Sequence, residues 1–217
     1  MKKEIATYNS DLGILSLYMV ADKITPIEKT NNRKIFKTNT HHIELILFDE
    51  IKEWMSKTKF PIDNSKGWII RITKIKSENE ELIFNCNLNK IDREVFNDVD
   101  CGEHLDSIYF ENKKAVMNIG TEDAEVLKRR ALENDWMPNR FKNFLGIYFE
   151  KYSITEIINY EEFETKIPNL EINEKIYFHY LIASKVKANI FDVENDISTN
   201  IAVDFSKRYL VEKLNIE

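Results

Sequence analysis

The sequence predicts a single α+β domain, in which an antiparallel or mixed β-sheet built from hairpins packs against several helices. Three observations favour this fold class. The 217 residues suffice for one large domain, and no internal repeat or composition break divides residues 1–217. Hydrophobic residues make up 43% and charged residues 31% of the chain, as in ordinary globular proteins. Segments that alternate apolar and polar residues stand beside segments with apolar residues at helical spacing.

The first part of the chain predicts one ambiguous segment and one helix. Residues 1–37 contain an apolar block from Ile14 to Val20, which fits a buried strand or a short helix, because periodicity does not separate the two. Pro26 interrupts whatever precedes it. A helix is expected from Thr40 to Lys57, because apolar side chains recur there at helical spacing. These side chains are Ile43, Leu47, Ile51 and Trp54.

The middle of the chain predicts two β-hairpins. Gly67–Lys76 and Glu81–Leu88 both alternate large apolar side chains, and a polar turn joins them. Ser107–Phe110 and Ala115–Ile119 form a second pair around a turn at residues 111–114. Both pairs are expected to form antiparallel ladders.

The last part predicts mainly helices. Thr121 is placed to cap a helix over Glu122–Asp135, whose first turn carries carboxylates that suit the positive end of the helix dipole. A second helix is expected from Asn139. Three further elements complete the expected order. They are a short helix over Thr155–Glu164 behind a capping box, an aromatic strand over Glu174–Lys187 and a C-terminal helix from Asn200.

Charge and cysteine content indicate which partners and which cellular compartment to expect. The net charge is -6 and the isoelectric point about 5.4, so nucleic acid is an unlikely partner, because phosphate contacts need a basic face. The two cysteines, Cys86 and Cys101, are expected to be reduced thiols in the cytosol. No apolar run reaches the roughly 18 to 20 residues of a membrane span. A cytoplasmic location is therefore expected.

An acidic loop from Asn97 to Asp106 is the first candidate site. Clustered carboxylates suit hard cations, and the Cys101 and His104 spacing is half of a zinc motif. The other half of that motif is missing, so a solvated loop or a partner-binding surface is favoured and no cofactor is expected. The partner-binding candidates are Asp98, Asp100, Glu103 and Asp106, and the alternative metal set is Asp98, Asp100 and His104.

Other combinations of residues support catalysis less well. His41 and His42, beside Glu44, would point about 100° apart on a helix and would chelate one ion poorly. Asp106 and the Glu111-Asn112-Lys113 segment resemble a nuclease site, but their spacing is too short to place them on different strands. His104, His179, Cys86 and Cys101 lack any recognised nucleophile signature. No catalytic residue is therefore predicted.

A basic cluster offers a last alternative. Lys128, Arg129 and Arg130, with Trp136 and Arg140, could grip a phosphate backbone and stack a base. A solvated helix face is the simpler interpretation, because cations favour the C-terminal end of a helix. The net negative charge of the chain supports the simpler interpretation.

His179 is expected to be a hydrogen-bonded core histidine.

The sequence thus favours a binding protein over an enzyme. Residues 92–106 hold six acidic residues against one Arg, and residues 150–174 hold seven Glu against two Lys. Such surfaces suit a basic protein partner. A small, acidic, cytosolic protein without a catalytic motif has the character of a bacterial immunity protein, which neutralises a basic toxin such as a nuclease, often one encoded by a neighbouring gene. The alternatives are a metal-dependent hydrolase or nuclease that uses residues 98–106, and a structural or oligomer-forming module.

Overall fold

The computed structural model describes residues 1–48, 62–91, 94–102, 105–143 and 154–187. Within these ranges the chain forms thirteen β-strands, one α-helix and one 3₁₀-helix. The strands are β1 (Lys2–Ser10), β2 (Gly13–Val20), β3 (Thr25–Lys29), β4 (Arg33–Lys37), β5 (His41–Phe48), β6 (Asn64–Lys74), β7 (Ile83–Lys90), β8 (Phe96–Gly102), β9 (Leu105–Glu111), β10 (Ala115–Glu122), β11 (Thr155–Ile158), β12 (Glu162–Lys166) and β13 (Lys175–Val186). The helices are α2 (Ala124–Glu133) and the 3₁₀-helix η1 (Asn139–Asn143).

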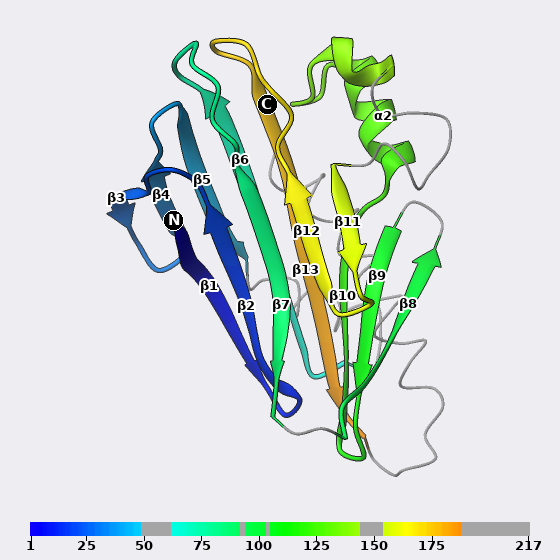
Figure 1. Cartoon of the computed structure of the whole chain (residues 1–217). Coiled ribbons are helices and arrows are strands. Elements are labelled where there is room, and N and C mark those ends of the chain that lie inside the picture. The colour runs from blue at the N-terminus through cyan, green and yellow to red at the C-terminus, as the bar shows by residue number, and fades with distance from the viewer. Residues whose placement is uncertain (49–61, 92–93, 103–104, 144–153, 188–217) are drawn as a thin grey trace.

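The strands form two antiparallel sheets that face each other (Figure 1). One sheet has the order β1-β2-β7-β12-β11, and the other has the order β3-β4-β5-β6-β13-β10-β9-β8. Figure 1 shows α2 beside one end of β13, at the upper edge of the larger sheet. The described part of the molecule is therefore a two-layer β structure with one helix at its edge.

A continuous core lies between the two sheets. Successive side chains of a strand point to opposite faces, so each sheet contributes alternate residues to this core. Phe84 of β7 meets Phe178 of β13 at a ring distance of 5.2 Å, and Phe163 of β12 meets Tyr180 of β13 at 5.8 Å. The buried Tyr180 hydroxyl lies 2.6 Å from Oγ1 of Thr165 in the opposite sheet. This hydrogen bond offsets the cost of burying the phenol.

The ambiguous N-terminal segment forms strands. β1 and β2 pair around a tight turn that ends at Gly13, whose φ of 138° is accessible to glycine but rarely to other residues. A Cβ atom at this position would lie 2.1 Å from the carbonyl oxygen of Asn89 in β7. Gly13 therefore permits both the turn and the close approach of β2 to β7.

The predicted α+β class is wrong, because two of the predicted helices are strands. The segment expected to be helical from Thr40 begins with β5, which pairs with β4 and β6. Ile43 and Leu45 of β5 point into the core, whereas Glu44 between them faces Arg71. Residues 49–57 of the predicted helix lie outside the described residues. The burial of β5 thus follows period two, and Ile46 on the outer face obscures that alternation in the sequence.

The predicted helix at Thr155–Glu164 is a β-hairpin. Thr155 pairs with Thr165 and Ile158 with Glu162, so that the three residues 159–161 join β11 to β12. The side-chain hydroxyls of Thr155 and Thr165 lie 2.8 Å apart, whereas the capping-box interpretation required a helix start at this position. Tertiary pairing with β7 determines the conformation here, and the local helix signal does not.

The predicted pairing of residues 67–76 with residues 81–88 is also wrong. Both segments are strands, β6 and β7, but β6 pairs with β5 and β13 whereas β7 pairs with β2 and β12. The polar segment between them crosses from one sheet to the other. Alternation identifies a strand but carries no information on its partner.

Several predicted elements are confirmed. β9 and β10 form the expected hairpin, and β13 matches the aromatic strand. α2 lies within the predicted helix, although Asp123 caps it, accepting a hydrogen bond from the N–H of Val126 at 2.9 Å. The second helix begins as the 3₁₀-helix η1, and its continuation after Asn143 lies outside the described residues, as does the predicted C-terminal helix.

Candidate functional site

The predicted acidic loop belongs largely to the β8–β9 hairpin at one edge of the larger sheet. Asp98 is exposed on β8, directly opposite Tyr109 of β9. Asp106 is half-buried on β9 and pairs with Cys101 in the ladder. Only the backbone of Asp100 and Cys101 is described, and Glu103 and His104 lie outside the described residues. Within the described ranges, no group of three His, Cys, Asp or Glu side chains is placed to hold a metal ion.

The two acidic segments of the sequence meet in space. The side-chain amide of Asn97, on β8, donates a 2.9 Å hydrogen bond to the carbonyl oxygen of Tyr160, in the turn between β11 and β12. Lys90, at the end of β7, donates from Nζ to Oδ1 of Asn97 at 2.8 Å and to Oε1 of Glu161 at 2.7 Å. Asn97 and Lys90 therefore join the two acidic segments at this edge of the molecule. Phe96 and Asp98 alternate with Asn97 along β8, so their side chains project from the outer face of that strand.

Three large apolar side chains are exposed in this region. Ile91 is 67% exposed, Phe96 is 56% exposed and Tyr160 is 61% exposed. Burying such side chains would stabilise a complex, and exposed apolar groups surrounded by polar ones are typical of interaction sites. We call this region the acidic–aromatic surface. Its members are Ile91, Glu94, Phe96, Asp98, Tyr160 and Glu161.

The turn that carries Tyr160 has a costly backbone conformation. Asn159 has a φ of 51° and Tyr160 a φ of 61°, and the N–H of Glu161 bonds to the carbonyl of Ile158 at 3.1 Å. Hairpin β-turns whose two central residues both have positive φ favour Asn followed by Gly. A tyrosine in place of that glycine is disfavoured, and such residues often occur at functional positions. The Asn-Tyr dipeptide between two alternating segments was the missed sequence signal for this turn.

Two of the three carboxylates of the acidic–aromatic surface are paired with lysines, Glu161 with Lys90 at 2.7 Å and Glu94 with Lys113. Glu94 lies 3.3 Å from Nζ of Lys113, but both side chains are at least 70% exposed, so water screens this ion pair. Asp98 accepts a hydrogen bond from the N–H of Val99, and no described Lys or Arg lies within ion-pair distance of it. These carboxylates can therefore exchange their contacts for those of a cationic partner.

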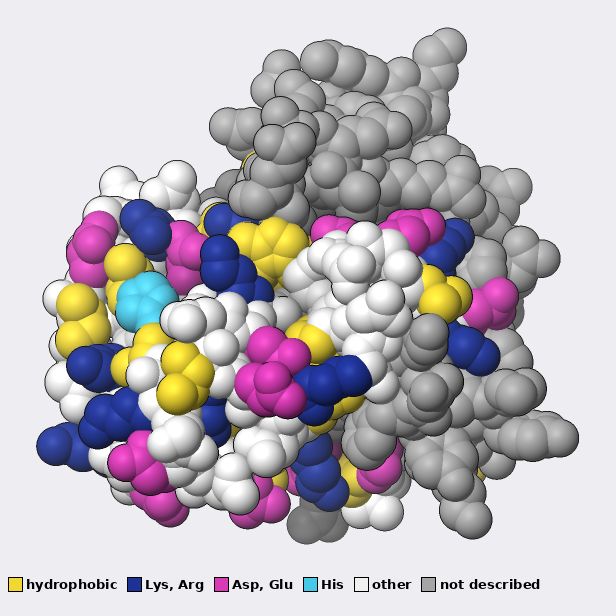
Figure 2. Space-filling model, turned by 90° about the horizontal axis from the view of Figure 1, so that it is seen from above, with side chains coloured by type: hydrophobic (Ala, Val, Ile, Leu, Met, Phe, Trp, Pro, Cys, Tyr) yellow, Lys and Arg dark blue, Asp and Glu magenta, His cyan; other side chains and the backbone are white. Residues whose placement is uncertain are grey.

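Other acidic residues of the second segment are held by internal cations. Lys166 bonds to Glu164 at 2.9 Å and is the main reason why the pKa of that carboxyl is lowered. Burial raises the pKa of Glu174, but hydrogen bonds from Arg140 and from a backbone N–H outweigh this effect and lower it. On the end of the molecule seen in Figure 2, acidic side chains lie among Lys and Arg and do not form one patch.

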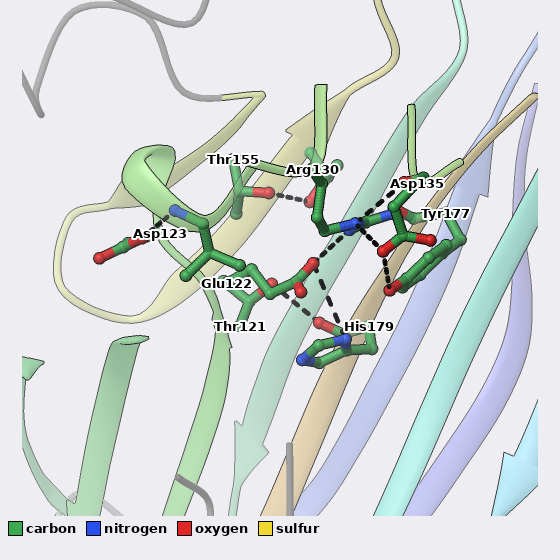
Figure 3. A network of polar contacts seen from close by, with 10 residues as sticks. Thr121, Glu122, Asp123, Arg130, Asp135, Thr155, Tyr177 and His179 are labelled. Atoms are coloured by element: carbon green, nitrogen blue, oxygen red, sulfur yellow. Dashed lines mark hydrogen bonds and ion pairs between the residues drawn. The ribbon is translucent and has the colours of Figure 1, made fainter. Parts of the chain in front are cut away.

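A buried polar network joins α2 to the larger sheet (Figure 3). Nη1 of Arg130 lies 2.5 Å from Oε2 of Glu122, and Nη2 donates to the carbonyl of Tyr177 at 3.0 Å. The guanidinium carbon lies 3.4 Å from the centre of the Tyr177 ring. Figure 3 shows that His179 points toward the same Glu122 carboxylate, with 4.0 Å between Nδ1 and Oε2. This arrangement is a charge-paired support for the helix.

The network corrects the expected role of the basic cluster. Arg130 is 4% exposed, so the prediction of a solvated helix face is wrong for this residue. Lys128 is half-buried and Arg129 is exposed on the same helix. His179 is 2% exposed and faces Glu122, in keeping with the expected core histidine.

The remaining catalytic candidates are either buried in the core or engaged in contacts within the protein. Cys86 is buried in the core, and burial raises the pKa of its thiol, which disfavours the nucleophilic thiolate. Glu111, from the nuclease-like combination, accepts hydrogen bonds from the Tyr109 hydroxyl at 2.5 Å and from Lys187 at 2.6 Å. Asp106 lies on the same strand as Glu111, not on a neighbouring one.

The histidine pair lies on β5 and not on a helix, so its two side chains point to opposite faces of the sheet. His41 is 2% exposed, and its Nδ1 lies 2.9 Å from Oγ1 of Thr40 and 3.7 Å from Oε2 of Glu80. Burial and the nearby Lys74 lower the pKa of His41 to about 4, although Glu80 acts in the opposite direction. His41 is therefore a neutral buried side chain near pH 7.

Comparisons with known proteins leave the family open. No family model matches the chain, and no curated protein matches it significantly. Among solved structures, one described as "Putative kojibiose phosphorylase from human microbiome" superposes with a TM-score of 0.44 and 10% sequence identity. The superposition covers 90% of this chain and 21% of that chain, so this chain spans about a fifth of that protein's length. Among the described residues, no helix has both the length and the apolar character needed to cross a bilayer.

Proposed function

We propose that this protein binds a basic protein partner through the acidic–aromatic surface and, as an immunity protein of a bacterial cytoplasm, neutralises a toxin in that way. The observation that supports this proposal is the exposure of two aromatic side chains at this edge: Tyr160 in the turn that contacts β8, and Phe96 on the outer face of β8. A binding role also gives a reason for the disfavoured backbone of Tyr160, because that turn projects an aromatic side chain at the tip of a hairpin.

The chemistry of the surface fits the contacts that dominate protein interfaces. Aromatic side chains supply much of the binding energy when a partner buries them, and a few such residues can account for most of the affinity. The surrounding carboxylates of Glu94, Asp98 and Glu161 favour a cationic partner, speed the encounter and disfavour acidic competitors. A toxin that acts on nucleic acid carries a basic surface of the required sign.

The test uses the basic protein encoded beside this chain's gene. Co-expression of the two is expected to protect cells, and titration calorimetry is expected to give a complex whose affinity falls with salt. Tyr160→Ser and Phe96→Ser should each weaken binding by about 30-fold or more, which corresponds to roughly 2 kcal/mol. Asp98→Lys should slow association, because it reverses one charge of the surface.

Matched controls come from exposed residues elsewhere. Ile172→Ser replaces an apolar side chain that is 51% exposed outside the surface, and Glu133→Lys reverses an exposed charge on α2. Both controls should bind like the parent protein. The proposal is refuted if the neighbouring basic protein does not bind, or if the Tyr160 and Phe96 variants bind as tightly as the controls.

A further inference from the structure

A cavity of about 450 Å³ lies beside α2, away from the acidic–aromatic surface. One wall comes from the chain that follows the helix, and the other comes from the loop that leads into β13. Cavities of this size are typical of small-molecule sites in proteins. Its described lining residues are Asn134, Trp136, Met137, Pro138, Asn139, Asn173, Glu174 and Lys175.

The two walls are fixed relative to each other. Arg140, at the start of η1, forms an ion pair with Glu174 of the opposite wall. Lys74 of β6 exchanges backbone hydrogen bonds with that wall, donating to the carbonyl of Glu174 at 3.0 Å and accepting from the N–H of Asn173 at 2.9 Å. Met137 is buried in the core and anchors the other wall. The cavity is therefore preorganised, which lowers the entropic cost of binding.

The indole of Trp136 forms one side of the cavity. Its ring centre lies 5.1 Å from the guanidinium carbon of Arg71 and 5.1 Å from Nζ of Lys175. Arg71 pairs with Tyr177 in the β6–β13 ladder, and Lys175 lies two residues before Tyr177, so these side chains project from the same face of the sheet. The indole therefore lies close to both cations. The backbone of Trp136 has a φ of 46°, which a bulky residue rarely adopts.

Three amide side chains with free hydrogen-bonding capacity line the same cavity. Asn134, Asn139 and Asn173 are exposed, and their side-chain amides make no hydrogen bond with any described residue. The carboxylate of Glu174 is already engaged by Arg140 and by the N–H of Glu171 at 2.6 Å. Beside this ion pair the cavity offers the three amides, which both donate and accept, and the Lys175 ammonium and Trp136 indole, which contact each other.

We infer that this cavity binds a saccharide. The hydroxyl groups of a sugar donate and accept hydrogen bonds, and each amide can satisfy neighbouring hydroxyls in both roles. The apolar C–H face of a sugar ring matches the flat surface of an indole, which is amphipathic in the same way. The ammonium group of Lys175 adds a donor for a ring oxygen, a hydroxyl or the carboxylate of an acidic sugar. This inference stands on the cavity and does not depend on the proposed partner.

The test measures binding of named saccharides to the full chain. Maltotriose, cellotriose, chitotriose and digalacturonic acid are titrated up to about 10 mM while tryptophan fluorescence and calorimetric heat are recorded, which covers the millimolar affinities expected of single sugar sites. At least one of these saccharides should bind and change the fluorescence. A preference for digalacturonic acid would assign its carboxylate to Lys175.

Variants locate the site of binding. Trp136→Ala should weaken binding of the saccharide by more than tenfold, and Asn139→Ala should weaken it by about fivefold, as expected for one lost hydrogen bond. Asn39→Ala changes an exposed amide outside the cavity and should bind like the parent chain. Thermal melts check that each variant is folded. The inference is overturned if none of the four saccharides binds, or if a saccharide binds equally to the folded Trp136→Ala and Asn139→Ala variants.

Discussion

Replacing Arg130 by methionine tests whether a buried charge network holds α2 on the larger sheet. Methionine keeps the length and the helix propensity of the side chain, so the change removes mainly the guanidinium group. That group contacts the carboxylate of Glu122 at 2.5 Å, the carbonyl of Tyr177 at 3.0 Å and the carbonyl of Asp135 at 3.3 Å. The variant leaves the Glu122 carboxylate, 2% exposed, without its cation.

The size of the expected loss of stability follows from the burial of the Glu122 carboxylate. Removing one partner of a buried ion pair costs about 3–5 kcal/mol, because the remaining charge stays desolvated. The free energy of unfolding of a whole domain is only about 5–15 kcal/mol, so Arg130→Met should remove a large fraction of it. For a chain of this size the melting temperature should fall by roughly 6–20 °C.

Urea and thermal unfolding, followed by circular dichroism, measure this loss. Arg129→Met changes an exposed neighbour on the same helix and should alter the free energy of unfolding by less than about 0.5 kcal/mol. Combining Arg130→Met with Glu122→Gln should recover at least about 1 kcal/mol, because the second change removes the uncompensated charge. A loss below about 1 kcal/mol for Arg130→Met, or a double variant no more stable than Arg130→Met, would contradict the proposed network.

Three further predictions concern other parts of the chain. Tyr160→Gly should raise the free energy of unfolding by up to about 1 kcal/mol, because glycine accepts positive φ without strain. The same variant should weaken partner binding. A less stable variant would show that the positive φ of Tyr160 is not strained. The pKa of His41, about 4 in the folded protein, lies below its unfolded value of 6.5, so its contribution to stability is complete above pH 6.5 and declines as the pH falls toward 4. His41→Gln should therefore flatten the dependence of the unfolding free energy on pH between 6.5 and 4, and an unchanged slope would refute this. In a Cys101→Ser background, Cys86 should react with a thiol reagent only on unfolding, and rapid labelling of the folded chain would show that its burial is not as described.

The sequence predicted the strands whose burial is strongest and the helix with a clear cap. β13 was predicted because six of its twelve residues are Ile, Val, Phe or Tyr, and it is buried on both faces as a central strand. β5 was missed because Ile46 places an apolar residue on its outer face, where it completes a helical pattern with Ile43 and Leu47. Short apolar runs carry both periods, and only the partners of a strand decide between them.

The partners of a strand could not be predicted from local sequence patterns, because pairing depends on residues far away in the chain. The short polar segment after β6 resembles a hairpin turn, but the chain uses it to change sheets, which is decided by how both sheets bury their apolar faces. The turn at Asn159 and Tyr160 was missed because turn recognition relies on glycine, and this chain has only five. The missed turn led to a predicted helix where the β11–β12 hairpin lies.

For the candidate sites, too, the sequence reveals the composition of a surface but not its geometry. The excess of acidic residues in two segments was visible in the sequence, but their meeting through Asn97 and the Tyr160 carbonyl was not. Neither was the distinction between carboxylates paired internally, such as Glu164, and those left to solvent, such as Asp98. Composition predicts the sign of a partner's charge, whereas the position of the surface depends on long-range strand pairing.

The acidic–aromatic surface and the saccharide cavity should act independently, because β12 separates them. Glu162 follows the turn of Tyr160, and the chain leaves β12 at Lys166 toward the loop of Glu174. Five residues of extended strand span about 16 Å, beyond the range at which substitutions usually couple. Trp136→Ala should therefore change affinity for the basic partner by less than about twofold, and the effects of Trp136→Ala and Tyr160→Ser should add within about 0.5 kcal/mol. A larger coupling energy in this double-mutant cycle would mean that one continuous surface serves both ligands.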